Sequence, residues 1–161
     1  MIVRPFADAD LAAVHAIQSK CPQAAQWRPE GYLHLAGEPG GLILVAEIEA
    51  GGPPEVAGFA AFHRVLDEAE LRNLAVAPAH QRQGIARALL EEGIRTLQRA
   101  GARRLFLEVR PSNYPALAFY ASAGFKFLCA RGSYYQDPAE DALVMACDMT
   151  HSSQLSTDVL D

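Results

Sequence analysis

Residues 71–90 join a strand-like run to a long amphipathic helix through a turn that contains Gln81, Arg82 and Gly84. The first N–H groups of such a helix have no partner inside it and carry the positive end of its dipole, so they can bind a phosphate or pyrophosphate. A glycine here has no Cβ to block a close approach. The turn lacks the Gly-Lys-Ser/Thr of a Walker loop and the Gly-x-Gly-x-x-Gly of a dinucleotide fold. The pattern therefore predicts an anion-binding turn of another kind.

Glu108 is the carboxylate best placed for acid–base chemistry. Side chains alternate along a strand, so a strand over residues 104–109 puts Glu108 and Phe106 on one face, where we expect the carboxyl group to lie among apolar neighbours. Partial burial would raise its pKa toward a range useful for proton transfer near neutral pH. The alternative is a glutamate at a strand end that is exposed or paired with Arg110.

The elements that must position these residues are indicated by hydrophobic spacing and by turn residues. Three strand-like runs follow one another through short turns, so consecutive antiparallel hairpins are expected. The strand–helix–strand unit after them implies a right-handed crossover and a parallel pair. We predict strands over residues 2–5, 42–48, 56–65, 70–76, 104–109, 125–131 and 141–149, with a polar loop between the last two. The predicted helices are one capped by Asp8 or Asp10, one after Pro29, one over 84–100, and one capped by Asn113 and ended by Gly124.

The composition indicates one ordinary globular domain: 161 residues, 50% hydrophobic and 20% charged. The net charge of −5 argues against general nucleic-acid binding. Residues 79–110 nevertheless carry seven arginines against three glutamates, a local charge of +4. A basic segment in an acidic protein suits a small polyanionic ligand better than a long phosphate backbone.

We expect a single domain over residues 1–149 and a loose tail over 150–161, which is rich in Ser and Asp. No apolar run approaches the ~20 residues that cross a bilayer, and the first ten residues lack the order of a secretory signal, so we expect a cytoplasmic protein. Cys21, Cys129 and Cys147 form no C-x-x-C pair and the histidines show no metal-binding spacing, so no metal site is predicted.

Two motifs resemble those of a known family. The pattern Gln-x-x-Gly-x-Ala over residues 81–86, after a strand that ends Leu-Ala-Val at 74–76, resembles the acetyl-CoA pyrophosphate motif of the GNAT superfamily of N-acetyltransferases. The run Leu-Glu-Val-Arg-Pro-Ser-Asn at 107–113 looks like the second half of that family's cofactor and catalytic region. It is followed, as in the family, by Ala116, Tyr120, Gly124 and Phe125. The resemblance extends over roughly residues 1–149 and is strongest over 68–128.

Within the superfamily the sequence most resembles the RimI-like branch, the bacterial ribosomal-protein alanine N-acetyltransferases. The shared marks are Glu108, Asn113, Tyr120 and the pair Tyr134-Tyr135. The resemblance implies an α+β fold of the GNAT type, with a central, mostly antiparallel twisted sheet, a parallel pair at the cofactor cleft and helices on both faces. It also implies acetyl-CoA as the cofactor. The residues expected to bind it are Leu74, Ala75, Val76, Gln81, Arg82, Gln83, Gly84, Ile85, Ala86, Arg87, Asn113 and Tyr120.

The resemblance also implies catalytic roles. Glu108 would be the base that takes the proton of an acceptor amine, directly or through water. Tyr120, which without the motif would be interpreted as a core residue, would be the acid that protonates the departing CoA thiolate. Glu70 is the alternative base, because some branches take theirs from the strand before the turn. We expect a backbone N–H near Val76, where the strand bulges, to meet the oxyanion.

A peptide or protein N-terminus is the acceptor that the resemblance favours. Trp27, Tyr32, Tyr134 and Tyr135 are the candidate walls of its groove. Acetyl transfer needs a neutral amine, and the ordinary pKa of an α-amine, ~8, lies below the ~10.4 of a lysine.

Two other functions stay open at this point. A small-molecule amine is the alternative acceptor, because acidic residues at 137, 140 and 141 would suit a cation. A non-catalytic acyl-CoA-binding module is the other alternative. Such a module would be expected to lack Glu108 and Tyr120, and this sequence contains both. The protein is expected to be a monomer or a homodimer.

Overall fold

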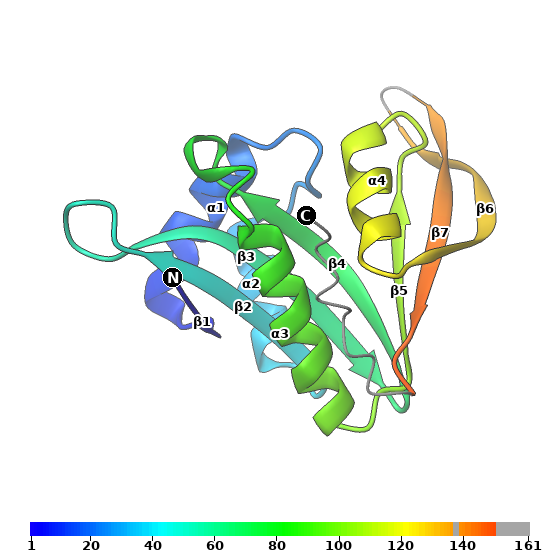
Figure 1. The fold of residues 1–161 in the computed structure, drawn as a ribbon, viewed down its shortest axis with the longest axis horizontal. Coiled ribbons are helices and arrows are strands. Elements are labelled where there is room, and N and C mark those ends of the chain that lie inside the picture. Colours follow the sequence, from blue (N-terminus) through cyan, green and yellow to red (C-terminus); the bar gives the residue numbers. More distant parts are fainter. Residues whose placement is uncertain (137–138, 151–161) are drawn as a thin grey trace, which may run out of the picture.

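The computed structural model describes residues 1–136 and 139–150. Within these residues seven strands form one mixed sheet in the order β1-β2-β3-β4-β5-β7-β6, antiparallel except for the parallel pair β4–β5 (Figure 1). The strands are β1 Ile2–Pro5, β2 Gly41–Ile48, β3 Glu55–Val65, β4 Glu68–Val76, β5 Arg104–Val109, β6 Lys126–Tyr135 and β7 Glu140–Asp148. The predicted fold class is confirmed. From residue 151 onward the expected tail lies outside the described residues.

Helices cover both faces of the sheet. They are α1 Leu11–Ser19, α2 Pro29–Gly37, α3 Ile85–Arg99 and α4 Tyr114–Ser122, with short 3-10 helices at Asp8–Asp10 and Pro78–His80. Helices α1 and α2 lie on one face, while α3 and α4 lie on the other (Figure 1). Each face has its own apolar core, because the buried side chains of α1 and α2 pack in one cluster and those of α3 in another.

The parallel pairing of β4 and β5 is short. It covers the residue pairs from Glu68↔Arg104 to Glu70↔Phe106, after which the two strands diverge (Figure 1). Beyond this point β5 is held by β7 on its other side. Both strands end on the open side, so the turn before α3 and the start of α4 come together there. The carboxyl ends of parallel strands are a common place for ligand sites in α/β folds.

Strand β6 extends to Tyr135, which corrects the prediction of a strand that ends at 131 before a polar loop. Its register with β7 shifts between Arg131 and Tyr135. Within this irregular stretch Ser133 has a φ of 50°, and its N–H donates to Oδ1 of Asp141 at 2.8 Å. The bulge thus lets the strand continue through Gly132 and Ser133, residues that by themselves favour a turn.

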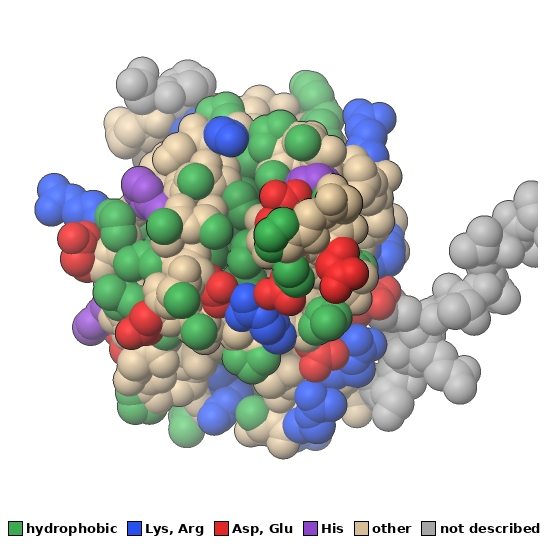
Figure 2. Space-filling view, turned by 90° about the vertical axis from the view of Figure 1, so that its left-hand side faces the viewer, with side chains coloured by type: hydrophobic (Ala, Val, Ile, Leu, Met, Phe, Trp, Pro, Cys, Tyr) green, Lys and Arg blue, Asp and Glu red, His purple; other side chains and the backbone are tan. Residues whose placement is uncertain are grey.

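Asp10 does not cap α1 with its side chain, contrary to one of the two predicted caps. Its buried carboxylate instead accepts hydrogen bonds from Nη1 and Nη2 of Arg4, at 2.8 and 2.9 Å, and from the N–H of Ala7. The guanidinium holds the pKa of Asp10 below its usual range. Arg4 also pairs with Glu47 at 2.9 Å, and thereby ties β1 to β2. Figure 2 shows the side of the molecule toward β1, where acidic and basic side chains lie together near the centre.

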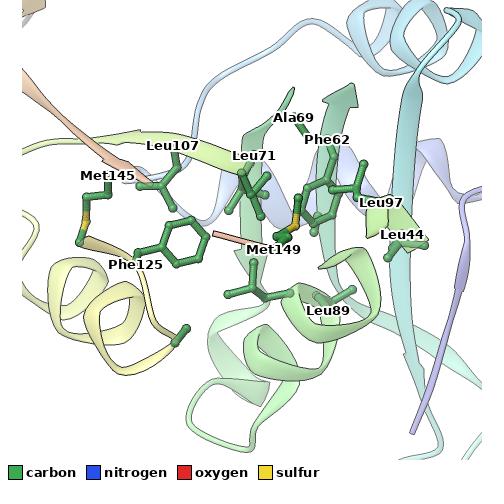
Figure 3. Close-up of a cluster of buried hydrophobic side chains, with 14 of the residues drawn as sticks. Leu44, Phe62, Ala69, Leu71, Leu89, Leu97, Leu107, Phe125, Met145 and Met149 are labelled. Atoms are coloured by element: carbon green, nitrogen blue, oxygen red, sulfur yellow. The ribbon is translucent and has the colours of Figure 1, made fainter. Parts of the chain in front are cut away.

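Helix α3 packs closely on the sheet. Its buried side chains include Leu89 and Leu97, which share one core with Leu44 and Phe62 of the sheet (Figure 3). Gly93 lies on the same side of the helix. A Cβ built on this residue would be 2.2 Å from Cζ of Phe62, so the aromatic ring occupies the space that a side chain would need.

We expect Gly93→Ala to lower the free energy of unfolding by up to about 2 kcal/mol, because an overpacking cost of about 1–3 kcal/mol against Phe62 exceeds the ~1 kcal/mol gain in helix propensity. The matched control is Gly37→Ala in α2, where no atom lies within 4 Å of the added Cβ. Denaturant unfolding should show the control to be neutral or slightly stabilising. A more stable Gly93→Ala protein would mean that the ring of Phe62 can move away freely.

Candidate active site

A cleft of about 1280 Å³ occupies the opening between β4 and β5. It is lined by residues 21–26, by residues 70–76 of β4, by the turn before α3, by the end of β5, by α4 and by the end of β6. A second hollow, of about 940 Å³, lies between α3 and strands β6 and β7 and contains none of the residues predicted to bind or react. We therefore build the site in the first cleft.

The turn before α3 presents backbone N–H groups to the cleft. Gly84 has a φ of 80°, and its carbonyl accepts the first helical hydrogen bond, from Ala88 at 3.0 Å. The N–H groups of residues 85–87 precede this bond and have no acceptor among the described residues. No atom of the chain lies within 4 Å of a Cβ built on Gly84, so the left-handed φ, and not crowding by the chain, favours glycine there. Unpaired donors at the positive end of a helix fit a pyrophosphate.

The side chains around this turn connect it to both walls of the cleft. Nε2 of Gln81 donates to the carbonyl of Val76 at 3.1 Å, which ties the turn to the end of β4. Arg87 donates from Nη2 to Oγ of Ser122 on α4 at 2.9 Å. Among the residues predicted to bind the cofactor, all of which the structure describes, Gln83 is the exception that does not line the cleft, and it is exposed.

The backbone of Val76 points into the cleft. The N–H of Ala77 donates to the carbonyl of Ala57 at 2.7 Å, so this residue pair is hydrogen-bonded across β3 and β4. In an antiparallel ladder the residue adjacent to such a pair, here Val76, directs its N–H and C=O away from the partner strand. The carbonyl of Val76 accordingly accepts from Gln81 and, at 3.3 Å, from Sγ of Cys21. Its N–H faces the same opening.

The bulge in β4 lies earlier than predicted. The register with β3 pairs Phe62 with Leu71 and Ala61 with Asn73, which leaves Arg72 unopposed, so the expected bulge near Val76 is wrong. The buried side chain of Asn73 exchanges hydrogen bonds with the backbone of Ala25, at 2.9 and 3.1 Å. Asn73, which sequence reasoning missed, therefore fixes the loop of residues 21–26 against β4. An Asn within an apolar strand was the available signal.

Two of the predicted groove residues belong to the core beneath that loop. Tyr32 is fully buried, receives a hydrogen bond from Asn73 at 3.0 Å, and donates to Oε1 of Gln18. Burial raises the pKa of its phenol. Half-buried Trp27 packs on Tyr32 with ring centroids 4.9 Å apart. Neither side chain lines the cleft, so the prediction that they form groove walls is wrong; they support the loop from below.

Tyr134 and Tyr135 do line the cleft. Their rings meet edge to face at 5.0 Å. The guanidinium carbon of Arg110 lies 4.3 Å from the ring centroid of Tyr135, and burial, as the largest cause, raises the pKa of this tyrosine to about 12. Both rings are placed by the bulge in β6.

Glu108 lies in the cleft in a polar environment. Its side chain is 18% exposed, and Oε1 accepts a hydrogen bond from Nη1 of Arg131 on β6. A hydrogen bond with Glu108 also raises the pKa of Tyr134. The expected apolar surroundings are therefore wrong, and so is the alternative pairing with Arg110, which pairs with Glu140 at 3.1 Å. The sheet order explains the error, because β6 lies two strands from β5 and Arg131 reaches Glu108 across the intervening strand β7.

The alternative base, Glu70, lines the same cleft from β4. Its side chain is about half exposed, and Oε2 lies 3.7 Å from Nε of Arg72. Glu70 also adds negative charge near the side chains of Arg131 and Tyr134. Two carboxylates therefore lie at the end of the cleft formed by β4, β5 and β6.

Tyr120 lies on α4 and lines the cleft. Its ring packs against Phe119 and Phe125, with centroid distances of 5.2 and 5.6 Å. Burial raises the pKa of its phenol, so the hydroxyl stays protonated at neutral pH, as a proton donor requires. Asn113 caps the same helix by accepting the N–H of Ala116 at 3.3 Å, which confirms the predicted cap.

Among the described residues, no group of His, Cys, Asp and Glu side chains is arranged to hold a metal ion. Nor does any helix in this part of the chain have the length and apolar character needed to span a bilayer.

A mixed sheet opened between two parallel strands, with unpaired helix N–H groups on one side of the opening and carboxylate and phenol side chains on the other, fits an acyltransferase. The family model of the GNAT acetyltransferases matches residues 11–125, and the chain belongs to this family. It is an N-acetyltransferase, as its resemblance predicted.

Individual relatives are similar over most of their length. The chain is 41% identical over 139 residues to the [ribosomal protein bS18]-alanine N-acetyltransferase of Escherichia coli K12, covering 85% of this chain and 90% of that protein. The crystal structure of the ribosomal-protein-S18-alanine N-acetyltransferase from Escherichia coli matches with a TM-score of 0.79 and 36% identity, over 95% of this chain and 96% of that one. Naa20 of Chaetomium thermophilum, solved with a bisubstrate analogue, matches with a TM-score of 0.80 and 28% identity, over 92% and 87%.

We expect Gly84→Asp to weaken the binding of acetyl-CoA, the donor that the family implies, by tenfold or more in calorimetry. The new carboxylate would face the phosphates at the turn. Gly84→Asn is the matched control, because it has a similar shape without the charge and tolerates a left-handed φ. Equal affinities of a folded Asp variant and the wild type would place the pyrophosphate elsewhere.

Glu108→Gln should lower kcat by about 10² to 10⁴ while the dissociation constant for acetyl-CoA stays the same, since base catalysis contributes a factor of this size. Glu70→Gln, measured beside it, tests the alternative base and should retain most of the turnover. Wild-type rates in folded Glu108→Gln between pH 6 and 9 would remove Glu108 from the mechanism.

Proposed function

We propose that this protein transfers the acetyl group of acetyl-CoA to the α-amine of a protein N-terminus, and that the N-terminal alanine of ribosomal protein bS18 is its acceptor. The observation that carries the proposal is the single cleft that brings the turn before α3, Glu108 and Tyr120 together. The acceptor is suggested by relatives whose names state this activity and that this chain matches over 85% of its own length.

Acetyl-CoA, when bound, supplies an acetyl group activated as a thioester. The unpaired N–H groups of residues 85–87 would hold its pyrophosphate, with Arg82 and Arg87 adding positive charge nearby. The free edge of β4 at Leu74–Val76 would lie along the rest of the molecule, where strand β5 has moved away. These residues bind and orient the donor, and they contribute no proton.

Proton transfer would fall to side chains on the other walls of the cleft. Glu108 would remove a proton from the acceptor's amine, directly or through a water molecule. The N–H of Val76 would meet the carbonyl oxygen as negative charge develops there. Tyr120, kept protonated by burial, would give its proton to the departing thiolate. The phenol and the carboxylate thus have separate roles because their surroundings differ.

An α-amine is the acceptor that this chemistry favours. At pH 7 an amine with a pKa of ~8 is roughly one-tenth neutral, whereas a lysine with a pKa of ~10.4 is neutral in less than about one molecule in a thousand. Two carboxylates, Glu70 and Glu108, lie where an ammonium group would approach. The site therefore attracts a protonated amine and can deprotonate it.

The small-amine alternative loses its support in the structure. Glu140 is engaged by Arg110 and by Ser112, and Asp141 accepts the N–H of Ser133, so both carboxylates already have structural partners. Asp137 lies outside the described residues. A non-catalytic module is disfavoured because Glu108 and Tyr120 both face the cleft.

The test compares kcat/KM for three acceptors: an alanine-initiated peptide with the N-terminal sequence of bS18, the same peptide with a blocked N-terminus and an internal lysine, and spermidine. We expect the free α-amine to react at least tenfold faster than either of the others, because far more of it is neutral at pH 7. A preference for the blocked peptide or spermidine would reject the N-terminal acceptor while leaving the acetyltransferase activity in place.

A further inference from the structure

The carboxylate of Glu108 is paired with a cation of the protein itself. Arg131 reaches over β7 from the edge strand β6 and donates from Nη1 to Oε1 of Glu108. A base that must accept a proton from an amine is thus engaged by a guanidinium in the absence of that amine. Glu108 and the neighbouring Tyr134 line the cleft, and the exposed side chain of Arg131 reaches Glu108 from outside this lining.

The backbone of β6 is shaped to make this contact. Between Arg131 and Tyr135 the register with β7 shifts by two residues, and Ser133 takes a φ of 50°. This conformation is uncommon for residues other than glycine, and here it is held by the hydrogen bond from Ser133 to Asp141. The bulge allows the guanidinium of Arg131 to stack on Tyr134, 4.5 Å from its centroid, while Tyr134 itself contacts Glu108.

The ion pair is also easily broken. The side chain of Arg131 is 55% exposed, so its guanidinium can move into water at little cost in solvation. Half-exposed ion pairs contribute little net free energy, because water competes for both charges. The carboxylate, in contrast, is 18% exposed and needs a cationic or hydrogen-bonding partner when the cleft fills.

We infer that Arg131 stands in for the acceptor's ammonium group: it occupies Glu108 while the cleft has no acceptor, is displaced when the amine binds, and returns when the amine has become a neutral amide. The inference rests on the proposed function, since it requires an amine acceptor that meets Glu108. Arg131 is a positioning residue in this scheme. The acetylated product carries no charge to compete for the carboxylate, so Arg131 need not be displaced for the product to bind.

The test measures binding in addition to turnover. A peptide that starts with alanine and carries a fluorophore at its C-terminal end is titrated with protein and CoA, and so is its N-acetylated form. We expect Arg131→Gln to bind the free-amine peptide about two- to fivefold more tightly than the wild type, because the variant lacks the guanidinium that competes weakly with the amine for Glu108. Its affinity for the acetylated peptide should stay the same.

Two variants control for charge. Arg131→Lys keeps a cation near Glu108 and should stay close to the wild type, whereas Lys126→Gln removes one positive charge from the other end of β6 and should change neither affinity. In steady-state kinetics the KM for the acceptor should fall in Arg131→Gln while the KM for acetyl-CoA is unchanged. A purely structural role of Arg131 would not separate the free amine from the acetylated peptide.

The outcomes distinguish this inference from the proposed function. If the wild type acetylates the peptide but Arg131→Gln binds both peptides as the wild type does, the inference is overturned and the proposed function stands. Weaker binding of the free amine by Arg131→Gln would also overturn it, because Arg131 would then be an acceptor ligand. A wild-type protein that neither binds nor acetylates any α-amine peptide would overturn both.

Discussion

The separation of β4 from β5 is the constraint on which the site depends. After three parallel residue pairs the backbone of β4 loses its neighbour, and backbone groups near a protein core need partners. Side chains supply several of them: Asn73 accepts the N–H of Leu74, and Gln81 and Cys21 donate to the carbonyl of Val76. The groups that are left face the cleft, where a substrate can complete them. The edge of β4 beyond its pairing with β5 can therefore serve as a binding surface.

Much of the fold could be predicted because its signals are local. Helix α3 was expected over 84–100 and begins and ends within one residue of that range, since its apolar side and its glycine turn are both encoded nearby. The end of β6 could not be predicted in this way. Gly132 and Ser133 favour a turn. They stay in the strand because β7, which comes later in the chain, pairs with Arg131 and Tyr135 on either side of them and supplies Asp141.

The residue types of the site were predictable, whereas their surroundings were not. The alternation along β5 that puts Glu108 and Phe106 on one face leaves Leu105, Leu107 and Val109 on the other, and these three residues are buried in the core. It could not reveal that Glu108 meets Arg131, because that contact crosses the intervening strand β7 and depends on strand order. Tyr32 illustrates the same difficulty, because a tyrosine in a short helix suits a groove or a core equally well. Only the hydrogen bonds of its hydroxyl group with Gln18 and Asn73 show that it belongs to the core.

The charges of the protein are divided along the cleft. At the turn before α3, arginines and the positive end of the helix dipole face the place suited to a polyanion, although the whole chain carries a net charge of −5. At the other end, Glu70 and Glu108 face the place suited to a cation. Salt screens fields beyond about 10 Å, so each end responds to its own neighbours and not to the net charge. On the proposed function, a single cleft would therefore attract an anionic donor and a cationic acceptor from opposite sides, which would bring the acyl group and the amine together between them.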